Sequence, residues 1–351
     1  MKILIMAGGK GTRFYPLSTI KKPKQFISFL GDQSLLQQTV SRVLKLVTYD
    51  DIFIATNQTY ASLVKEQLPL LEDDHIIIEP MYKDTAAAIT YGIIYISLFQ
   101  ENPIVAVLAS DHVISDEDQF IHNLKQAFDL AKHGSIVTLG IQPTRVETGY
   151  GYIHVQEQSL NQPQKVIAFL EKPSLEKATE YVKNGFYMWN SGMFIMSFET
   201  LKQELKNHLP QYFDIMHQLL TIMNVTAKNV LSEAVRDTFT LFPSLSIDYA
   251  LMEKTTNVLC IPVSIGWSDV GGYNALPEVL GVTKDGHTVN TNHYLYLDSK
   301  DNIIITDDVL KKVNTIGVNQ MVIVYLKDTL LVCHRDQTDQ IKTLLDLYED
   351  A

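Results

Sequence analysis

The sequence predicts an α/β fold with a mainly parallel sheet, followed by a small β module near the carboxyl terminus. Continuously apolar runs alternate with helix-like stretches through the first half of the chain. Such runs are typical of parallel strands buried on both faces, and the alternation is typical of βαβ units. After about residue 287, helix-like patterns are absent until the final residues. The length of 351 residues suits a large domain plus a smaller one.

The expected elements of the first half follow this alternation. Strands are predicted at Ile3–Ala7, Ile52–Ala55, Ile76–Ile78, Ile104–Ala109 and Ile136–Ile141. Helices are predicted between them at Leu35–Lys45, Thr59–Leu68, Ala86–Ser97 and Phe120–Lys132. Later strands are expected at Gly149–Val155, Val166–Glu171, 189–196 and 258–265, with helices at Leu175–Lys183 and Glu199–His208. These later elements are interpreted as insertions and closing strands of the same domain, which spans residues 1–280.

The remaining residues, 287–351, are predicted to form the β module and to end in a helix. Short apolar runs lie at Tyr294–Leu297, Ile303–Ile305, Met321–Tyr325 and Leu330–Cys333, and the helix-like stretch is Gln337–Tyr348. So few residues cannot bury both faces of their strands, so the module is expected to pack on the large domain or on a second subunit. A homodimer is therefore expected.

Composition excludes several classes of protein. The formal net charge of −11 argues against a nucleic-acid partner, because such proteins are usually basic. No apolar run approaches the roughly 20 residues of a membrane helix, and the apolar run at the amino terminus is too short for a signal peptide. Cys260 and Cys333 have neither metal nor disulfide spacing. A cytoplasmic protein without a membrane partner is the simplest interpretation.

A glycine-rich loop follows the first predicted strand and reads Met6-Ala7-Gly8-Gly9-Lys10-Gly11-Thr12-Arg13. Glycines let backbone N–H groups approach an anion, and Arg13 could pair bidentately with a phosphate. Residues 1–31 contain no Asp or Glu, so this part of the acidic chain is locally basic. The loop matches neither the Walker pattern nor the dinucleotide pattern. A tight strand-to-helix turn is the alternative interpretation.

Eight motifs in chain order resemble those of the sugar-nucleotide pyrophosphorylases, most closely the mannose-1-phosphate guanylyltransferase branch. They are the glycine loop with Pro23-Lys24-Gln25-Phe26, Glu79-Pro80 with Asp84–Ile89, Leu108–His112, Thr148–Ile153, Phe169–Pro173, Trp189–Phe194, Ser246–Tyr249 and Trp267–Gly271. The resemblance implies a Rossmann-like nucleotidyltransferase domain and a short left-handed β-helix at the carboxyl terminus. It also implies transfer of a guanylyl group from GTP to α-D-mannose 1-phosphate, giving GDP-mannose and pyrophosphate.

This reaction needs no general base, because the attacking sugar phosphate is already an anion. Catalysis must come from positioning and from neutralising phosphate charge. Asp111 and Asp269 are the candidate ligands for Mg²⁺, which takes few carboxylates and completes its shell with phosphate oxygens and water. A helix N-cap for Asp111 and a turn residue for Asp269 are the alternatives. His112 lacks a second histidine at ligand spacing and is expected to be structural or to contact a metal ligand rather than the metal itself.

The resemblance assigns the remaining site residues. The catalytic set is Arg13, Lys24, Asp111 and Asp269. The nucleotide and its phosphates are assigned to Ala7, Gly8, Gly9, Gly11, Thr12, Arg13, Glu79, Thr85 and Ser110. The sugar and its phosphate are assigned to Lys24, Gly149, Tyr150, Glu171, Lys172 and Asn190.

The residues alone leave the base and the sugar open. Spacing does not distinguish guanine from thymine or adenine, and Thr19 stands where the family usually has Arg. A heptose-1-phosphate guanylyltransferase and a hexose-1-phosphate thymidylyltransferase are the nearest alternatives. A non-catalytic regulatory subunit that binds sugar nucleotides is a third, but such a protein could lose Arg13, Lys24, Asp111 or Asp269, and all four are present.

Overall fold

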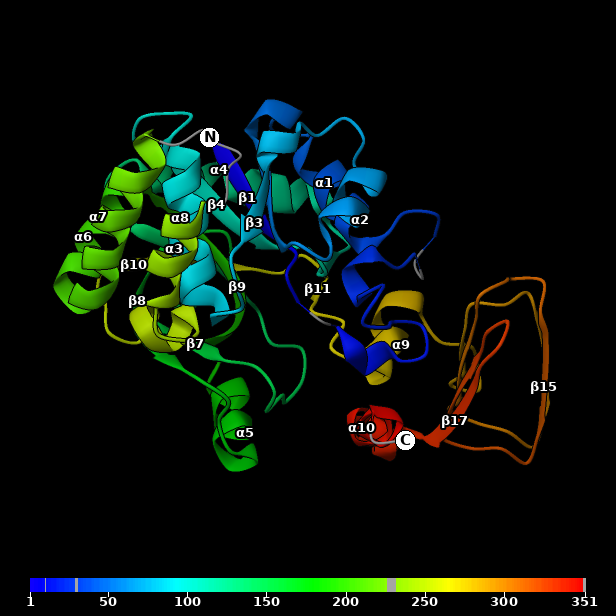
Figure 1. The fold of residues 1–351 in the computed structure, drawn as a ribbon. Helices are drawn as coiled ribbons and strands as arrows, with labels where there is room; N and C mark the ends of the chain where they lie inside the picture. The colour runs from blue at the N-terminus through cyan, green and yellow to red at the C-terminus, as the bar shows by residue number, and fades with distance from the viewer. Residues whose placement is uncertain (10, 29–30, 226–231, 350–351) are drawn as a thin grey trace. The chain divides into compact units, whose positions relative to one another are not determined.

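The computed structural model describes residues 1–9, 11–28, 31–225 and 232–349 (Figure 1). Lys10, which belongs to the basic loop, lies outside the described residues. The chain forms two compact units. The first consists of Met1–Gly8, Val40–Ser110 and Ile114–Trp267, and the second of Gly9–Thr39, Asp111–Val113 and Ser268–Ala351. The short strands β5 (Val113–Ile114) and β11 (Trp267–Ser268) lie where the chain passes between the units.

A nine-stranded sheet forms the centre of the first unit, in the order β3-β2-β1-β4-β9-β6-β10-β8-β7. The strands are β1 (Lys2–Met6), β2 (Ile52–Asn57), β3 (Ile76–Glu79), β4 (Ile104–Ala109), β6 (Ile136–Ile141), β7 (Tyr152–Val155), β8 (Gln164–Leu170), β9 (Tyr187–Ser197) and β10 (Val258–Val263). Strands β3, β2, β1 and β4 are parallel, whereas β9 runs antiparallel to both β4 and β6. The carboxyl ends of β1 to β4 therefore share one edge of the sheet.

Helices cover this sheet in more than one layer. Those that contact its strands are α2 (Ala61–Gln67), α3 (Asp84–Ser97), α4 (Glu117–Ala131), α5 (Leu175–Asn184) and α6 (Phe198–His208), whereas α7 (Pro210–Val225) and α8 (Glu233–Thr240) pack mainly against other helices. Helix α3 approaches β1 closely, since a Cβ added at Gly92 would lie 2.6 Å from Leu4 Cδ2. Helices α6, α7 and α8 lie side by side (Figure 1). Helices α7 and α8 were not predicted from the sequence.

The second unit contains the predicted β module. Strands β12 (Thr288–Val289), β14 (Ile303–Thr306), β16 (Met321–Tyr325) and β17 (Leu330–His334) form one sheet, and β13 (His293–Leu297) pairs in parallel with β15 (Lys312–Ile316). The helices are α9 (Leu276–Leu280) and α10 (Ile341–Glu349), and α1 (Leu35–Val43) crosses the unit boundary. Strand β15 was not predicted, whereas the expected terminal helix is confirmed as α10.

The core of the second unit joins the two ends of the chain. Phe14, from the loop after β1, is fully buried with Ile303, Ile305 and Val322. Its ring lies 5.0 Å from that of Tyr273, whose hydroxyl donates to the Phe14 carbonyl at 2.9 Å. Phe14, Ile27 and Leu35 therefore pack with the carboxyl-terminal part of the chain. This packing holds the Thr12–Phe14 part of the glycine loop in place.

Candidate functional site

A pocket of about 300 Å³ in the second unit collects residues from three distant stretches of the chain. It is lined by Gly11, Thr12, Arg13, Phe14, Lys24, Asp111, His112, Asp269 and Gly271. All four residues of the predicted catalytic set are among them. Such a concave site with convergent charged groups can hold a polyanionic ligand beside a cation.

The glycine loop forms one wall of this pocket, and its geometry requires glycine at position 11. Gly11 has φ 53°, and a Cβ there would lie 2.7 Å from the Lys24 backbone nitrogen. The chain then turns through a short 3-10 helix, Thr12–Phe14, which buries Phe14 and leaves Arg13 exposed. The Arg13 guanidinium forms no ion pair with any residue that the structure describes. It is therefore available to an anion.

Lys24 is buried and connects the other parts of the pocket. Its Nζ donates to the backbone carbonyls of Asp269 at 2.6 Å and Val270 at 2.9 Å, and it lies 2.9 Å from Asp111 Oδ2. These three acceptors use the three N–H bonds of the ammonium. Burial of the Asp111 carboxyl opposes its ionisation and is the largest single influence, but the charges of Lys24 and His112 and the hydrogen bonds to the carboxylate together outweigh it and place the pKa of Asp111 below its ordinary value.

Asp111 and Asp269 enter the pocket from two different turns. Asp111 follows β4, and the N-cap of the next helix, α4, is Asp116, so the N-cap alternative for Asp111 is wrong. Asp269 does make a turn contact, because its Oδ1 accepts from the Gly271 N–H at 3.1 Å. Val270, which lies between Asp269 and Gly271, is fully buried with φ 44°, a conformation that strains a β-branched residue. Lys24 helps to hold this strained turn.

Further nucleotide candidates lie in the first unit at the carboxyl ends of its parallel strands. Ala7 donates its N–H to Ala55 at 2.7 Å, and the Ser110 N–H donates to Met6 at 3.2 Å. Glu79 ends β3, and its Oε1 would lie 3.1 Å from a Cβ added at Gly8. Burial raises the pKa of Glu79 from 4.5 to about 7. Gly9, in the second unit, accepts from Gln25 Nε2 through its carbonyl at 2.9 Å.

A second pocket, of about 790 Å³, lies in the first unit and contains candidates for the nucleotide and for the sugar. It is lined by Asp84, Thr85, Glu171, Lys172, Ser244, Leu245, Ser246, Asp248, Tyr249 and Glu253. The Thr85 hydroxyl accepts from the Ile247 N–H at 2.8 Å, and Lys172 Nζ lies 3.1 Å from Glu171 Oε1. The structure therefore brings Thr85, Glu171 and Lys172 together.

The other sugar candidates are not in the lining of this second pocket, although Asn190 contacts a residue that lines it. Asn190 donates from Nδ2 to Asp248 Oδ1 at 2.6 Å. Gly149 donates its N–H to Glu147 Oε1 at 2.8 Å. Tyr150 packs edge-on against Trp189, with ring centroids 5.3 Å apart. Asp248 lies within the Ser246–Tyr249 motif but has no predicted role, because spacing alone does not show its contact with Asn190.

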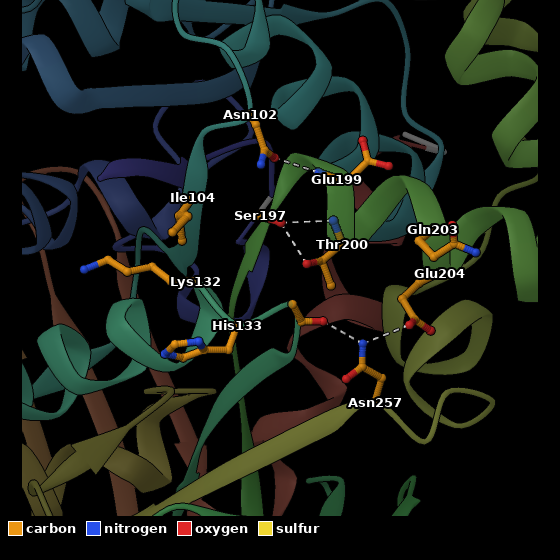
Figure 2. Close-up of a pocket in the computed structure, with 11 residues that line it drawn as sticks. Asn102, Ile104, Lys132, His133, Ser197, Glu199, Thr200, Gln203, Glu204 and Asn257 are labelled. Carbon is orange, nitrogen blue, oxygen red and sulfur yellow. Dashed lines mark hydrogen bonds between the residues drawn. The ribbon is translucent and has the colours of Figure 1, made fainter.

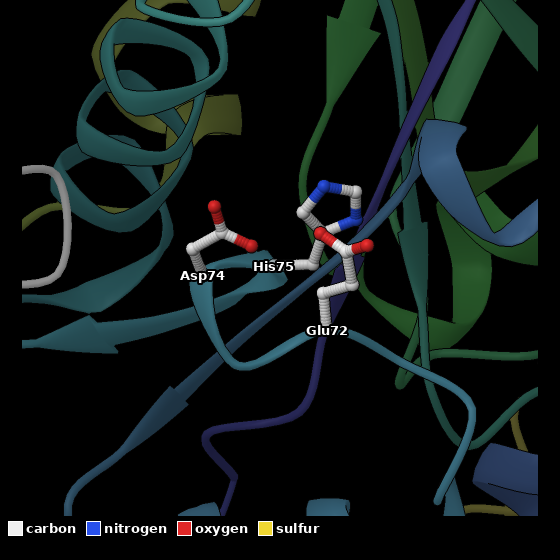
Figure 3. A group of neighbouring side chains, drawn as sticks. All are labelled: Glu72, Asp74 and His75. Atoms are coloured by element: carbon white, nitrogen blue, oxygen red, sulfur yellow. The ribbon is translucent and has the colours of Figure 1, made fainter.

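Two other features of the first unit contain none of the predicted site residues. A pocket of about 540 Å³ near the start of β4 is lined by residues that include His133, Glu204 and Asn257 (Figure 2). Glu72, Asp74 and His75 have possible metal-ligand atoms within 4.8 Å of one another (Figure 3). However, His75 Nδ1 lies 3.0 Å from the Ile52 carbonyl and is therefore a donor to the backbone.

None of the described helices is both long enough and apolar enough to cross a bilayer.

Comparison with known proteins agrees with the fold and the motifs. The "Nucleotidyl transferase" family model matches residues 2–285, and the "MannoseP isomerase/GMP-like beta-helix domain" model matches residues 292–347. The chain is 37% identical to a mannose-1-phosphate guanylyltransferase of Salmonella muenchen over 98% of this chain and 72% of that protein. It is 34% identical to a mannose-1-phosphate guanylyltransferase of Escherichia coli K12 over 98% of this chain and 72% of that protein.

A solved structure covers nearly the whole chain. The protein from Thermus thermophilus described as a mannose-1-phosphate geranyltransferase superposes with a TM-score of 0.88 at 28% identity, covering 99% of each chain. The agreement extends through the β module, so the predicted β-helix-like terminal domain is confirmed. From its sequence, its fold and the ordered motifs, this chain belongs to the nucleotidyl transferase family.

Proposed function

We propose that this protein transfers a guanylyl group from GTP to α-D-mannose 1-phosphate, giving GDP-mannose and pyrophosphate. The observation that carries the proposal is the convergence of Arg13, Lys24, Asp111 and Asp269 on one pocket. Relatives named mannose-1-phosphate guanylyltransferase, at 34–37% identity over nearly the whole chain, support the choice of substrates. The attacking oxygen belongs to a phosphate that is already ionised, so no residue has to abstract a proton. The chain has only to position the two substrates and to neutralise the charge of their phosphates.

Asp111 and Asp269 would hold Mg²⁺. Both offer carboxylate oxygens, the ligands that Mg²⁺ prefers, and the Asp111 side chain is 33% exposed, which leaves room for phosphate oxygens and water. Lys24 already places a cationic group 2.9 Å from Asp111 Oδ2, so this carboxylate is suited to a neighbouring positive charge. When bound, the metal would neutralise charge on the phosphates.

The glycine loop would supply the anion contacts. Backbone N–H groups of Gly8, Gly9, Gly11 and Thr12 are proposed to bind the triphosphate. Ala7 and Ser110 are proposed nucleotide contacts through other atoms, because their N–H groups already donate to the carbonyls of Ala55 and Met6. Arg13 is exposed on the wall of the pocket and would meet the charge that develops on the departing pyrophosphate. Lys24 would meet the phosphate of the sugar, which requires that phosphate to replace one of the acceptors that the ammonium now has.

Glu79 would select guanine, with Thr85 as a further nucleotide contact. Its carboxyl is half-buried and forms no hydrogen bond to any described residue, so a ligand can supply donors to it. The Watson–Crick edge of guanine offers two adjacent donors, N1–H and the 2-amino group. Thymine offers one N–H between two carbonyl acceptors, which a carboxylate would repel. This difference favours guanine over thymine.

The second pocket would bind the sugar. Glu171, Lys172 and Asn190 are proposed to meet the hydroxyls and the phosphate, with Gly149 and Tyr150 shaping the surrounding wall. Lys172 brings a positive charge to a pocket that is otherwise lined by carboxylates and hydroxyls. A phosphorylated polyol has the matching groups.

The domain assignment and the assembly are also proposals. We propose a catalytic domain over residues 1–280 and a β-helix module over 287–351, supported by the family matches to 2–285 and 292–347.

We propose a cytoplasmic homodimer. Leu295, Leu297 and Ile316 on β13 and β15 are 72%, 60% and 74% exposed, an apolar strip that a second copy would cover. Light scattering that gave the mass of a monomer at micromolar concentration would contradict the dimer.

Pyrophosphate release tests the substrates. Purified protein with Mg²⁺ should release pyrophosphate fastest from GTP with mannose 1-phosphate. The same assay with dTTP, UTP or ATP, and with heptose or other hexose 1-phosphates, covers the alternative enzymes. Activity with none of these pairs, accompanied by tight binding of GDP-mannose, would favour the regulatory subunit.

A further inference from the structure

Asp248, Asn190 and Glu171 converge around Gly151 in the first unit. A Cβ added at Gly151 would lie 2.6 Å from Glu171 Oε2 and 3.6 Å from Asn190 Nδ2, so both side chains lie against the backbone of this glycine. Asn190 in turn donates to Asp248 Oδ1 at 2.6 Å. Two carboxylates and one amide therefore meet at one place beside the second pocket.

The orientation of Asn190 is fixed at both ends of its side chain. Its Nδ2 donates to Asp248, and its Oδ1 accepts from the Gly192 N–H at 3.0 Å. Its backbone N–H donates to the Gly151 carbonyl at 2.8 Å. The contact with Asp248 requires the amide nitrogen to face the carboxylate, and the second N–H of that nitrogen is left for a ligand.

Asp248 itself lines the pocket and begins a π-helical turn, Asp248–Met252. Such turns are rare and are frequent at functional sites. Burial raises the pKa of Asp248, the hydrogen bond from Asn190 opposes that effect, and nearby Glu171 adds to it. The carboxylate forms no ion pair with any residue in the described part of the chain. A carboxylate that is mostly buried without a cation needs further hydrogen-bond donors.

We propose that Asp248 is a specificity-determining residue that accepts a hydrogen bond from a hydroxyl of the sugar and fixes the orientation of Asn190. The inference rests on the proposed function, because it assigns the sugar to the second pocket. Hydroxyls are good hydrogen-bond donors to carboxylates. The neighbouring Glu171 and Asn190 would form hydrogen bonds with adjacent hydroxyls of the sugar. A site built this way rejects an analogue that lacks the recognised hydroxyl, because the buried acceptor is then left unpaired.

The test uses Asp248→Asn, with Glu176→Gln as the matched control. Glu176 is an exposed carboxylate on α5 that does not line the second pocket, so its substitution removes the same charge without touching Asn190. We expect Asp248→Asn to raise the KM for the sugar phosphate at least about tenfold and to change the KM for GTP less than about twofold. Glu176→Gln should leave both values within about twofold. Thermal melting of both variants checks that they fold.

Deoxy analogues of the sugar phosphate make the test specific. The wild type should discriminate against one analogue, the one that lacks the hydroxyl bound by Asp248, and Asp248→Asn should lose that discrimination selectively. Equal effects of the two substitutions, or unchanged discrimination in Asp248→Asn, would overturn the inference. If the wild type prefers another sugar 1-phosphate, the proposed substrate fails, and the same comparison with the preferred sugar still decides the role of Asp248.

Discussion

Replacing Glu79 by glutamine should stabilise the protein while weakening its binding of GTP. Burial raises the pKa of this carboxyl from 4.5 to about 7, so the folded state binds the proton more tightly than the unfolded state does. Between these two pH values the stability contributed by Glu79 falls as pH rises, and above about pH 7 the full penalty is present. At about 1.4 kcal/mol per pKa unit, the penalty reaches roughly 3 kcal/mol.

Thermal melting across pH measures this effect. Glutamine carries no charge, so Glu79→Gln should have the same melting temperature as the wild type below about pH 4.5. At pH 8 its melting temperature should be several degrees higher, because each kcal/mol of added stability raises it by about 2–4 °C. The matched control is Glu66→Gln, which replaces an exposed carboxylate on α2. Its melting temperature should differ little from that of the wild type at every pH. A Glu79→Gln protein that is no more stable than the wild type at pH 8 would refute the burial argument.

Calorimetry tests the link to guanine. The ionised Glu79 would accept from two donors of the base, so binding of GTP at pH 6 should release up to about one proton in the wild type and none from this site in Glu79→Gln. Affinity for GTP should fall at least about tenfold, because an amide offers guanine one acceptor and one opposing donor. Unchanged affinity together with higher stability would show that Glu79 is buried for another reason.

The remaining predictions concern the pocket of the second unit. Asp111→Asn and Asp269→Asn should each lower turnover at least roughly a hundredfold at limiting Mg²⁺, and near-normal turnover in both would remove the metal assignment. Arg13→Ala should lower kcat with little change in the KM for GTP, whereas a change confined to that KM would make Arg13 a binding residue only. Lys24→Ala should raise the KM for mannose 1-phosphate more than that for GTP, and should lower turnover. It should also destabilise the protein by about 1–3 kcal/mol, because Asp111 and two carbonyls lose their donor. Loss of GTP binding alone in Lys24→Ala would contradict the proposed role.

Local pattern was enough to predict the strands of the sheet. The run Ile104–Ala109 is apolar because β4 is buried on both faces, and the run at Ile3–Ala7 has the same cause. Helix α7 could have been found as well, since Tyr212, Ile215, Met216 and Leu219 follow helical spacing and are buried.

Contacts between distant residues could not be derived from pattern. Lys24 meets Asp269 across 245 positions, and Phe14 accepts from Tyr273 across 259. Both contacts depend on the folded arrangement of three chain segments, which no periodicity encodes. The family motifs identified the participants, and the structure supplied their contacts.

Phosphorus NMR of one reaction mixture tests the central claim most directly. With the wild-type protein, Mg²⁺, GTP and mannose 1-phosphate, we predict that the signals of the sugar phosphate decline while those of pyrophosphate and of GDP-mannose grow in equal amounts. Exchange of GTP for dTTP should slow this conversion at least about a hundredfold. Hydrolysis of GTP without a sugar-linked product, or conversion only with another base or sugar phosphate, would contradict the account.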